Sequence, residues 1–174
     1  MIHTDYAIGA LEVLLNADCL SERYAPLIAY KDCLLAELPR LGCRTKSDAE
    51  KLSDGALTGI GLPDEQTVRL FRRFLTIYET NEQKLREIPK VTSDPQEQAA
   101  FRELYHLPGV KAVRASLYYR SGYRSVADFV HASVEEVRAR TAATIAEYGM
   151  DCIVPLPKEI RTHIAVAQAL TWEE

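Results

Sequence analysis

The 174-residue sequence contains no run of eighteen or more apolar residues, so we expect no membrane-spanning helix. Residues 1–5 also lack a basic segment followed by an apolar core, and they do not resemble a secretory signal. We therefore expect a cytoplasmic protein. Its apolar fraction of 47% and charged fraction of 26% are typical of a soluble globular chain.

Cysteine is sparse and scattered along the sequence. The four cysteines form no C-x-x-C pair, and the four histidines have no cysteine or carboxylate neighbour at the spacing of metal ligands. The sequence also lacks a glycine-rich phosphate loop and a nucleophile motif around any serine, cysteine or histidine. We therefore expect reduced thiols, no metal, no cofactor and no catalytic activity.

Period-two alternation is absent as well, whereas helical spacing of apolar residues recurs along the chain. We therefore predict an all-α protein. Residues 89–95 contain two prolines and are the best candidate for a linker, which gives two expected units, 1–90 and 91–174. The longer expected helices are 4–16, 21–38, 63–78 with an extension toward 88, 133–147 and 157–170.

Residues 104–117 indicate two helices joined by a tight turn. The first helix ends near Leu104, Pro108 and Gly109 form the turn, and a second helix follows. The first backbone N–H groups of that second helix have no partner within it, and Gly109 allows another backbone to come close. This is a suitable place for a phosphate group. An apolar set is expected to hold the helices together: Leu104, Leu107, Val110, Val113 and Leu117.

The formal net charge of −4 is unusual for a nucleic-acid-binding protein, but the charge is unevenly distributed. Residues 1–100 carry 12 basic and 16 acidic side chains, whereas residues 101–174 carry nine of each. Within residues 102–124 only Glu103 opposes five basic residues, so we expect a basic patch around the turn. Its members are Arg102, Lys111, Arg114, Arg120 and Arg124.

The sequence also contains an internal repeat. Residues 42–49 align with residues 122–129, and the alignment continues without gaps through Leu57 and Val137. In both copies a glycine ends one helix, a hydroxyl group caps a short helix, and a second hydroxyl group caps the next helix. We infer two duplicated helical units.

The turn at residues 107–115 resembles the helix-hairpin-helix motif, whose pattern is an apolar residue, Gly, an apolar residue, Gly, three variable residues and Ala. Leu107, Gly109, Val110 and Ala115 match this pattern, and Lys111 stands in place of the second glycine. In that family the hairpin amides contact a nucleic-acid phosphate. The resemblance therefore implies a phosphate contact here, to which Lys111 can contribute its side chain.

The first copy carries its own recognisable hairpin at residues 59–63. Residues 42–71 are also similar to the C-terminal domain of the bacterial RNA polymerase alpha subunit, which shares this fold. The resemblance implies two related helix-hairpin-helix-like (SAM-like) units packed together. Asp64 and Glu65 follow the first hairpin, and we expect their carboxylates to repel a phosphate there.

The favoured hypothesis is a non-catalytic protein that binds the DNA or RNA backbone through the C-terminal hairpin, largely without sequence preference. Aromatic and basic residues are interleaved at 118–124, a composition that can stack on bases and neutralise phosphates. Two alternatives stay open: Gly109 serves only close helix packing, or the chain is a protein-interaction scaffold that does not bind nucleic acid. The candidate contact residues are Gly109, Val110, Lys111, Arg114, Arg120, Tyr123 and Arg124.

Overall fold

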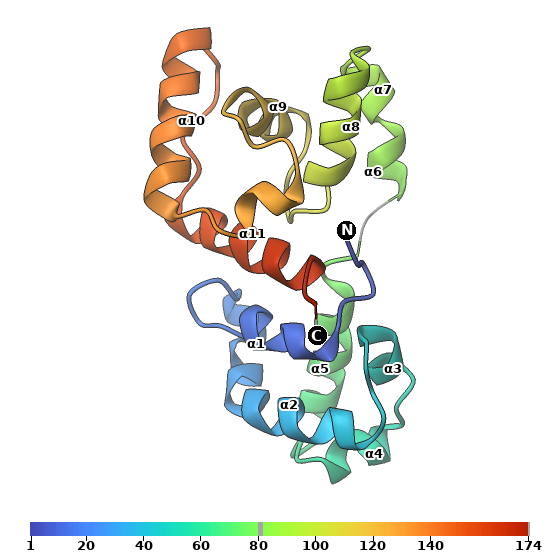
Figure 1. Ribbon diagram of the computed structural model, residues 1–174. Helices are drawn as coiled ribbons and strands as arrows, with labels where there is room; N and C mark the ends of the chain where they lie inside the picture. Colours follow the sequence, from blue (N-terminus) through green and yellow to red (C-terminus); the bar gives the residue numbers. More distant parts are fainter. Residues whose placement is uncertain (80–81, 174) are drawn as a thin grey trace. The chain divides into compact units, whose positions relative to one another are not determined.

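The computed structural model describes residues 1–79 and 82–173, and the regular secondary structure of this part is helical (Figure 1). Its one β feature there is an isolated antiparallel bridge between Ala7 and Thr45. The predicted all-α class is confirmed. None of the described helices is long and apolar enough to cross a membrane.

The chain divides into two compact units. The first unit comprises residues 1–77 and 168–174, and the second unit comprises residues 78–167. Within the first unit, the amide of His3 donates a hydrogen bond of 2.7 Å to the carbonyl oxygen of Leu170. This bond joins the two ends of the chain and explains why the last residues belong to the first unit.

The boundary predicted at residue 90 does not coincide with this division. The expected linker begins inside helix α7 (Ile88–Val91), and the side chain of Ile88 is fully buried. Pro89 lies in the first turn of that helix, where its missing N–H costs no hydrogen bond. The proline that suggested a linker is therefore compatible with a short helix.

The first unit is built from short helices, and two of them differ from those expected. The helix expected over 4–16 is shorter, and the one expected over 21–38 is divided between a 3-10 segment and an α-helix. Pro26 lies within the 3-10 segment, where it lacks the N–H that a continuous α-helix requires. The elements are η1 (Ile8–Ala10), α1 (Leu11–Leu14), η2 (Glu22–Tyr30), α2 (Lys31–Arg40), α3 (Lys46–Glu50), α4 (Asp54–Gly59) and α5 (Glu65–Thr76).

Helix α5 provides much of the core of the first unit. It packs against η2 and α4, and its residues Phe71 and Phe74 are fully buried. The ring of Phe74 meets the ring of Tyr24 on η2 edge to face, with 5.8 Å between centroids. Burial of such large rings is the main source of stability in a small helical unit.

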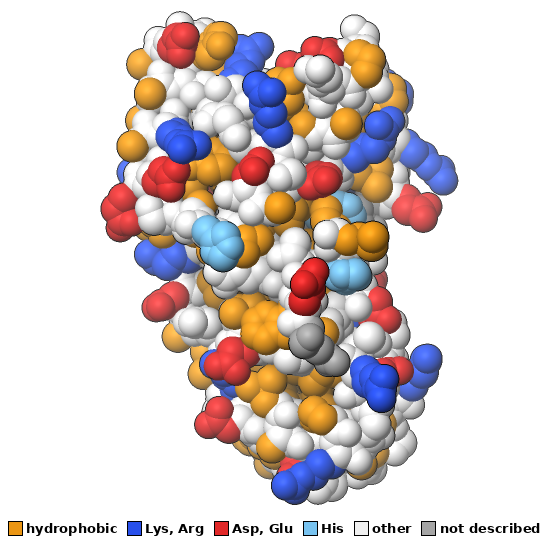
Figure 2. All heavy atoms as spheres, viewed as in Figure 1, with side chains coloured by type: hydrophobic (Ala, Val, Ile, Leu, Met, Phe, Trp, Pro, Cys, Tyr) orange, Lys and Arg blue, Asp and Glu red, His pale blue; other side chains and the backbone are white. Residues whose placement is uncertain are grey.

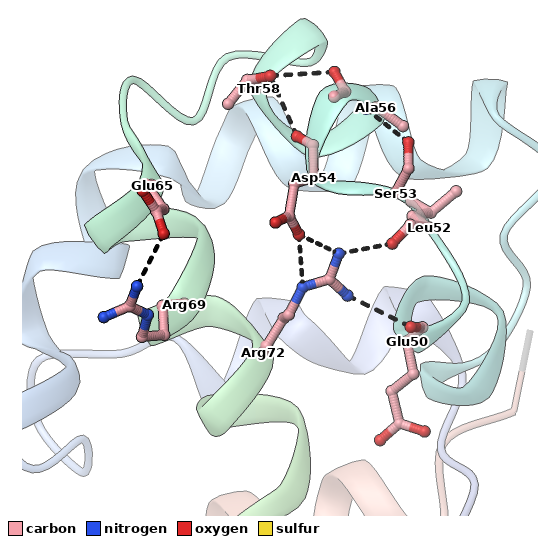
Figure 3. A network of polar contacts seen from close by, with 10 residues as sticks. Glu50, Leu52, Ser53, Asp54, Ala56, Thr58, Glu65, Arg69 and Arg72 are labelled. Atoms are coloured by element: carbon pink, nitrogen blue, oxygen red, sulfur yellow. Dashed lines mark hydrogen bonds and ion pairs between the residues drawn. The ribbon is translucent and has the colours of Figure 1, made fainter.

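Arg72 on α5 joins three backbone segments of the first unit (Figure 3). Its Nε and Nη2 atoms donate hydrogen bonds to Oδ1 of Asp54 at 3.0 and 2.6 Å. The same guanidinium donates to the carbonyl oxygens of Leu52 at 2.6 Å and Glu50 at 3.3 Å. The end of a helix leaves carbonyl groups unpaired, and two of these four hydrogen bonds satisfy such carbonyl groups in the turn between α3 and α4. Its role is structural.

In the second unit, α8 and α10 both pack against α9 (Figure 1). The rings of Tyr118 and Phe129 meet at 4.8 Å in its core. The extension expected from residue 63 toward residue 88 is not one helix, because α5 ends at Thr76; residues 80–81 lie outside the described residues. The elements are α6 (Glu82–Arg86), α7, α8 (Pro95–Leu104), α9 (Ala112–Arg120), η3 (Val126–Phe129), α10 (Val134–Tyr148) and α11 (Pro157–Leu170), whose end belongs to the first unit.

Two segments that lie 80 positions apart share a set of hydrogen bonds. Gly42 and Gly122 have positive φ values of +84° and +95°. Oδ2 of Asp48 accepts bonds of 2.8 and 3.1 Å from the amides of residues 44 and 45. Oδ2 of Asp128 accepts bonds of 2.8 and 3.0 Å from the amides of residues 124 and 125.

The correspondence continues into the next helix of each segment. Oγ of Ser53 accepts a hydrogen bond of 3.1 Å from the amide of Ala56 and caps α4. Oγ of Ser133 accepts one of 3.1 Å from the amide of Glu136 and caps α10. The capping roles predicted for both serines are confirmed.

Candidate nucleic-acid interface

The turn between α8 and α9 places Gly109 at the surface, with a φ of +73° that favours glycine. Leu104, Leu107 and Val110 are fully buried beneath it, as expected for residues that hold the two helices together. Val113 was expected to join them, but it is 58% exposed. It lies in the first turn of α9, and the side chains that α9 buries begin at Ala115.

The start of α9 differs from the starts of α5, α8 and α10. Its N-cap is Lys111, and within the described residues no side chain caps its amides and no acidic residue lies in its first turn. By contrast, α5, α8 and α10 begin with Asp64, Asp94 and Ser133, whose side chains accept from the first amides. Helix α2 also lacks a side-chain cap, but it carries an acidic residue in its first turn. The positive end of the α9 dipole is therefore left for another anion.

A second lysine lies at this turn, contributed by α6. Nζ of Lys84 donates a hydrogen bond of 3.3 Å to the carbonyl oxygen of Tyr105 and lies 5.2 Å from the centroid of its ring. Burial, and then the positive charge of Lys111, lower the pKa of Lys84. The two ammonium groups are thus close enough to repel each other. Lys84 was not among the residues predicted from the sequence, because it precedes Gly109 by 25 positions and belongs to no motif.

Arg114 is engaged within the second unit. Its Nε and Nη2 atoms donate to the two carboxylate oxygens of Glu159 at 2.9 and 3.3 Å, and Nη1 donates to the carbonyl oxygen of Ile153 at 3.2 Å. The side chain is only 17% exposed. A phosphate would have to displace Glu159 to reach it, so Arg114 is a weaker candidate than the sequence suggested.

Arg120 and Arg124 lie at the opposite end of α9 from Lys111. At 1.5 Å per residue, Arg120 is about 13 Å along the helix axis from Lys111. The guanidinium of Arg120 lies 4.7 Å from the ring centroid of Tyr148, and that of Arg124 lies 4.7 Å from the ring centroid of Tyr119. Both arginines are exposed, but they lie too far from Lys111 to contact the same phosphate group.

Two of the seven predicted contact residues have buried side chains. Val110 is fully buried, and Tyr123 is 2% exposed. The ring of Tyr123 stacks on that of Phe129 at 4.9 Å and carries the guanidinium of Arg140 at 5.3 Å. The aromatic residues of the segment 118–124 therefore pack within the second unit, and its arginines lie against rings of the same unit. The structure brings together only Gly109 and Lys111 of the predicted set, and it adds Lys84.

The buried side chain of His163 on α11 holds the turn between α8 and α9 in place. Nε2 of His163 lies 2.8 Å from the carbonyl oxygen of Pro108, and Nδ1 lies 2.8 Å from the hydroxyl oxygen of Tyr118. Because a carbonyl oxygen only accepts, Nε2 carries the proton and Nδ1 of the neutral ring accepts from Tyr118. Burial lowers the pKa of His163, which favours this neutral form.

Apolar side chains are also exposed in this region of the second unit. Val113 is 58% exposed, Ile153 is 70% exposed and Leu156 is 58% exposed. The hydrogen bond from Arg114 to the carbonyl oxygen of Ile153 holds the loop that precedes α11 against the first turn of α9. Such side chains are typical of a surface that contacts another protein.

The hairpin at residues 59–63 of the first unit is arranged differently. The carboxylate of Asp64 accepts bonds of 2.8 Å from both the amide and the hydroxyl group of Thr67, and these bonds lower the pKa of Asp64. A Cβ on Gly61 would lie 2.7 Å from Sγ of Cys33, so this glycine is required for close packing. The first amides of α5 are therefore already capped by the carboxylate of Asp64.

Charge is balanced within the second unit. Residues 78–167 contain twelve basic and twelve acidic residues, so the whole excess of four acidic residues lies in the first unit. Figure 2 shows basic and acidic side chains interspersed on the visible face of each unit. Any positive potential at the start of α9 is therefore local.

Comparisons of the chain with models of protein families, with curated proteins and with solved structures gave no match.

Proposed function

We propose that the second unit binds the phosphate backbone of DNA or RNA at the start of α9, weakly and without sequence preference, as a non-catalytic cytoplasmic protein. The observation that carries this proposal is the uncapped start of α9 beside two ammonium groups, those of Lys84 and Lys111. Backbone amides and lysines bind phosphate without reading bases.

We also propose that both units are degenerate helix-hairpin-helix units related by duplication. The hydrogen bonds repeated at an interval of 80 positions support this proposal. The positive φ of Gly109 supports it further, because glycine adopts this conformation without strain in the tight turn between the two helices of a hairpin. In the first unit the equivalent contact is lost, since position 29 is alanine and Asp32 lies in the first turn of α2.

The contact is small, and its salt dependence should be correspondingly modest. Each neutralised phosphate contributes a slope of about −0.9 to a plot of log K against log salt concentration. Two lysines therefore imply a slope of about −2. The experiment is a titration of a fluorescent DNA duplex at several salt concentrations, compared between the wild type and K111E.

A second candidate function is a contact with another protein, favoured by the exposed Val113, Ile153 and Leu156. This interface would depend on apolar contacts and would persist at high salt. Replacement of Ile153 by Asp should abolish such a contact and leave a phosphate contact unchanged. K111E should have the opposite effect, so the two variants separate the two functions.

A further inference from the structure

A groove of about 590 Å³ lies beside the end of α2 in the first unit. Its lining includes Gly9, Leu35, Pro39 and Arg44. We call this feature the Arg44 groove. The Arg44 side chain is exposed, and within residues 1–79 and 82–173 it has no ionic or hydrogen-bonding partner.

The second unit has an aromatic ring at the position that corresponds to Pro39. The positions that correspond to Pro39 and Arg44, 80 residues later, are Tyr119 and Arg124. The guanidinium of Arg124 lies 4.7 Å from the ring centroid of Tyr119. The same ring meets that of Phe101 edge to face, with 6.4 Å between centroids.

The two positions are equivalent because the backbone around them makes the same hydrogen bonds. The amide of Cys43 donates to the carbonyl oxygen of Leu38 at 3.1 Å, and the amide of Tyr123 donates to that of Tyr118 at 2.9 Å. The next amides donate to the capping aspartates described above. Pro39 therefore stands where Tyr119 carries its ring, and the first unit has a groove where the second has that ring.

We infer that the Arg44 groove binds a tyrosine side chain presented by a partner protein. The guanidinium of Arg44 covers one face of the ring, as Arg124 covers Tyr119, and the aliphatic side chains of Leu35 and Pro39 contact it. The groove is larger than one ring and leaves room for the residues that flank the tyrosine. A neutral ring suits it better than an anion, because Arg44 also borders a second hollow that contains Asp5 and Glu173.

The probe for this site is N-acetyl-L-tyrosinamide, followed by the amide resonances of the full-length protein in two-dimensional NMR. We expect shifts confined to residues around the groove, including Gly9, Gly42 and Arg44. The cyclohexylalanine analogue, which has the same shape without an aromatic face, should bind several-fold more weakly. R44Q should weaken binding of the tyrosine probe to a similar extent. Shifts elsewhere, or equal binding of the two probes, would overturn the inference.

A matched pair of variants tests whether a tyrosine ring supplied by the chain itself fits the Arg44 groove. P39Y supplies the ring that the second unit carries, and P39A removes the proline without supplying a ring. P39A should bind the probe like the wild type, whereas P39Y should not bind it and should melt a few degrees above P39A. If P39Y binds the probe like P39A, or melts at or below the temperature of P39A, no ring fits the groove and the inference is wrong.

Discussion

Nε2 of His163 donates a hydrogen bond of 2.8 Å to the carbonyl oxygen of Pro108, 55 positions earlier in the chain. Through this bond α11 holds the turn that presents Gly109 and the start of α9. Tyr118 completes the arrangement by donating to the other ring nitrogen of His163. The turn is thus supported by side chains that the hairpin motif does not include.

The His163 bond should make the stability of the second unit depend on pH. Burial lowers the pKa of His163 in the folded state below its usual value near 6.5. The unfolded chain therefore takes up the proton more readily, so the stability from the neutral ring is complete above about pH 6.5 and is lost as the pH falls below it. Urea denaturation of the wild type and H163Q should show a stability difference that is largest at pH 7.5 and shrinks at pH 5. A constant difference would contradict this assignment.

Removal of the Tyr118 hydroxyl group should destabilise the second unit. In Y118F, Nδ1 of His163 is left without its donor in a site that is 1% exposed. An unsatisfied buried polar group costs about 1–3 kcal/mol of the free energy of unfolding. Y148F, which changes a half-exposed ring, should stay within about 0.5 kcal/mol of the wild type. Equal stability of Y118F and Y148F would show that the bond contributes nothing.

Arg72 should be more important for stability than Arg69, although both lie on α5 (Figure 3). R72A leaves the carbonyl oxygens of Glu50 and Leu52 without their donor, and we expect a loss of about 1–3 kcal/mol. R69A breaks only an exposed ion pair with Glu65, so it should cost about 0.5 kcal/mol or less. Thermal or urea denaturation of the two variants checks this order, and a reversed order would contradict it.

Gly42 should not tolerate a side chain, although nothing lies within 4 Å of the position that its Cβ would take. Its φ of +84° is disfavoured for other residues, so G42A should lose about 1–2 kcal/mol. Gly55 has no such φ, lies inside α4 and has space for a Cβ, so G55A should gain about 0.5–1 kcal/mol. The two alanine variants should therefore shift the denaturation midpoint in opposite directions.

Local signals in the sequence predicted several helix caps, although they did not predict the lengths of the first helices. Thr45 and Ser125 form capping boxes with Asp48 and Asp128, and Gly149 ends α10 in the left-handed conformation. These features depend on residues three or four positions apart, so their chemistry is visible in the sequence.

Contacts between distant residues were not predictable in the same way. Arg114 lies 45 positions from its partner Glu159, and Lys84 reaches the turn from a helix that has no motif. Likewise, the spacing of aromatic residues did not show that Tyr123 is buried, because Tyr123 lies between α9 and η3, where no helical period predicts the direction of a side chain. The candidate site is consequently smaller than the basic patch expected from the sequence, and one of its two lysines was unexpected.

The most direct test of the phosphate contact is the affinity of a short fluorescent DNA duplex, measured by anisotropy across a series of salt concentrations. The matched control is K31E, since Lys31 occupies the position of Lys111 in the first unit. We predict that log K for the wild type and K31E falls with log salt concentration with a slope of about −2, and that K84Q/K111E loses binding while its circular dichroism spectrum is unchanged. Binding by K84Q/K111E with the affinity and salt slope of the wild type would contradict the account.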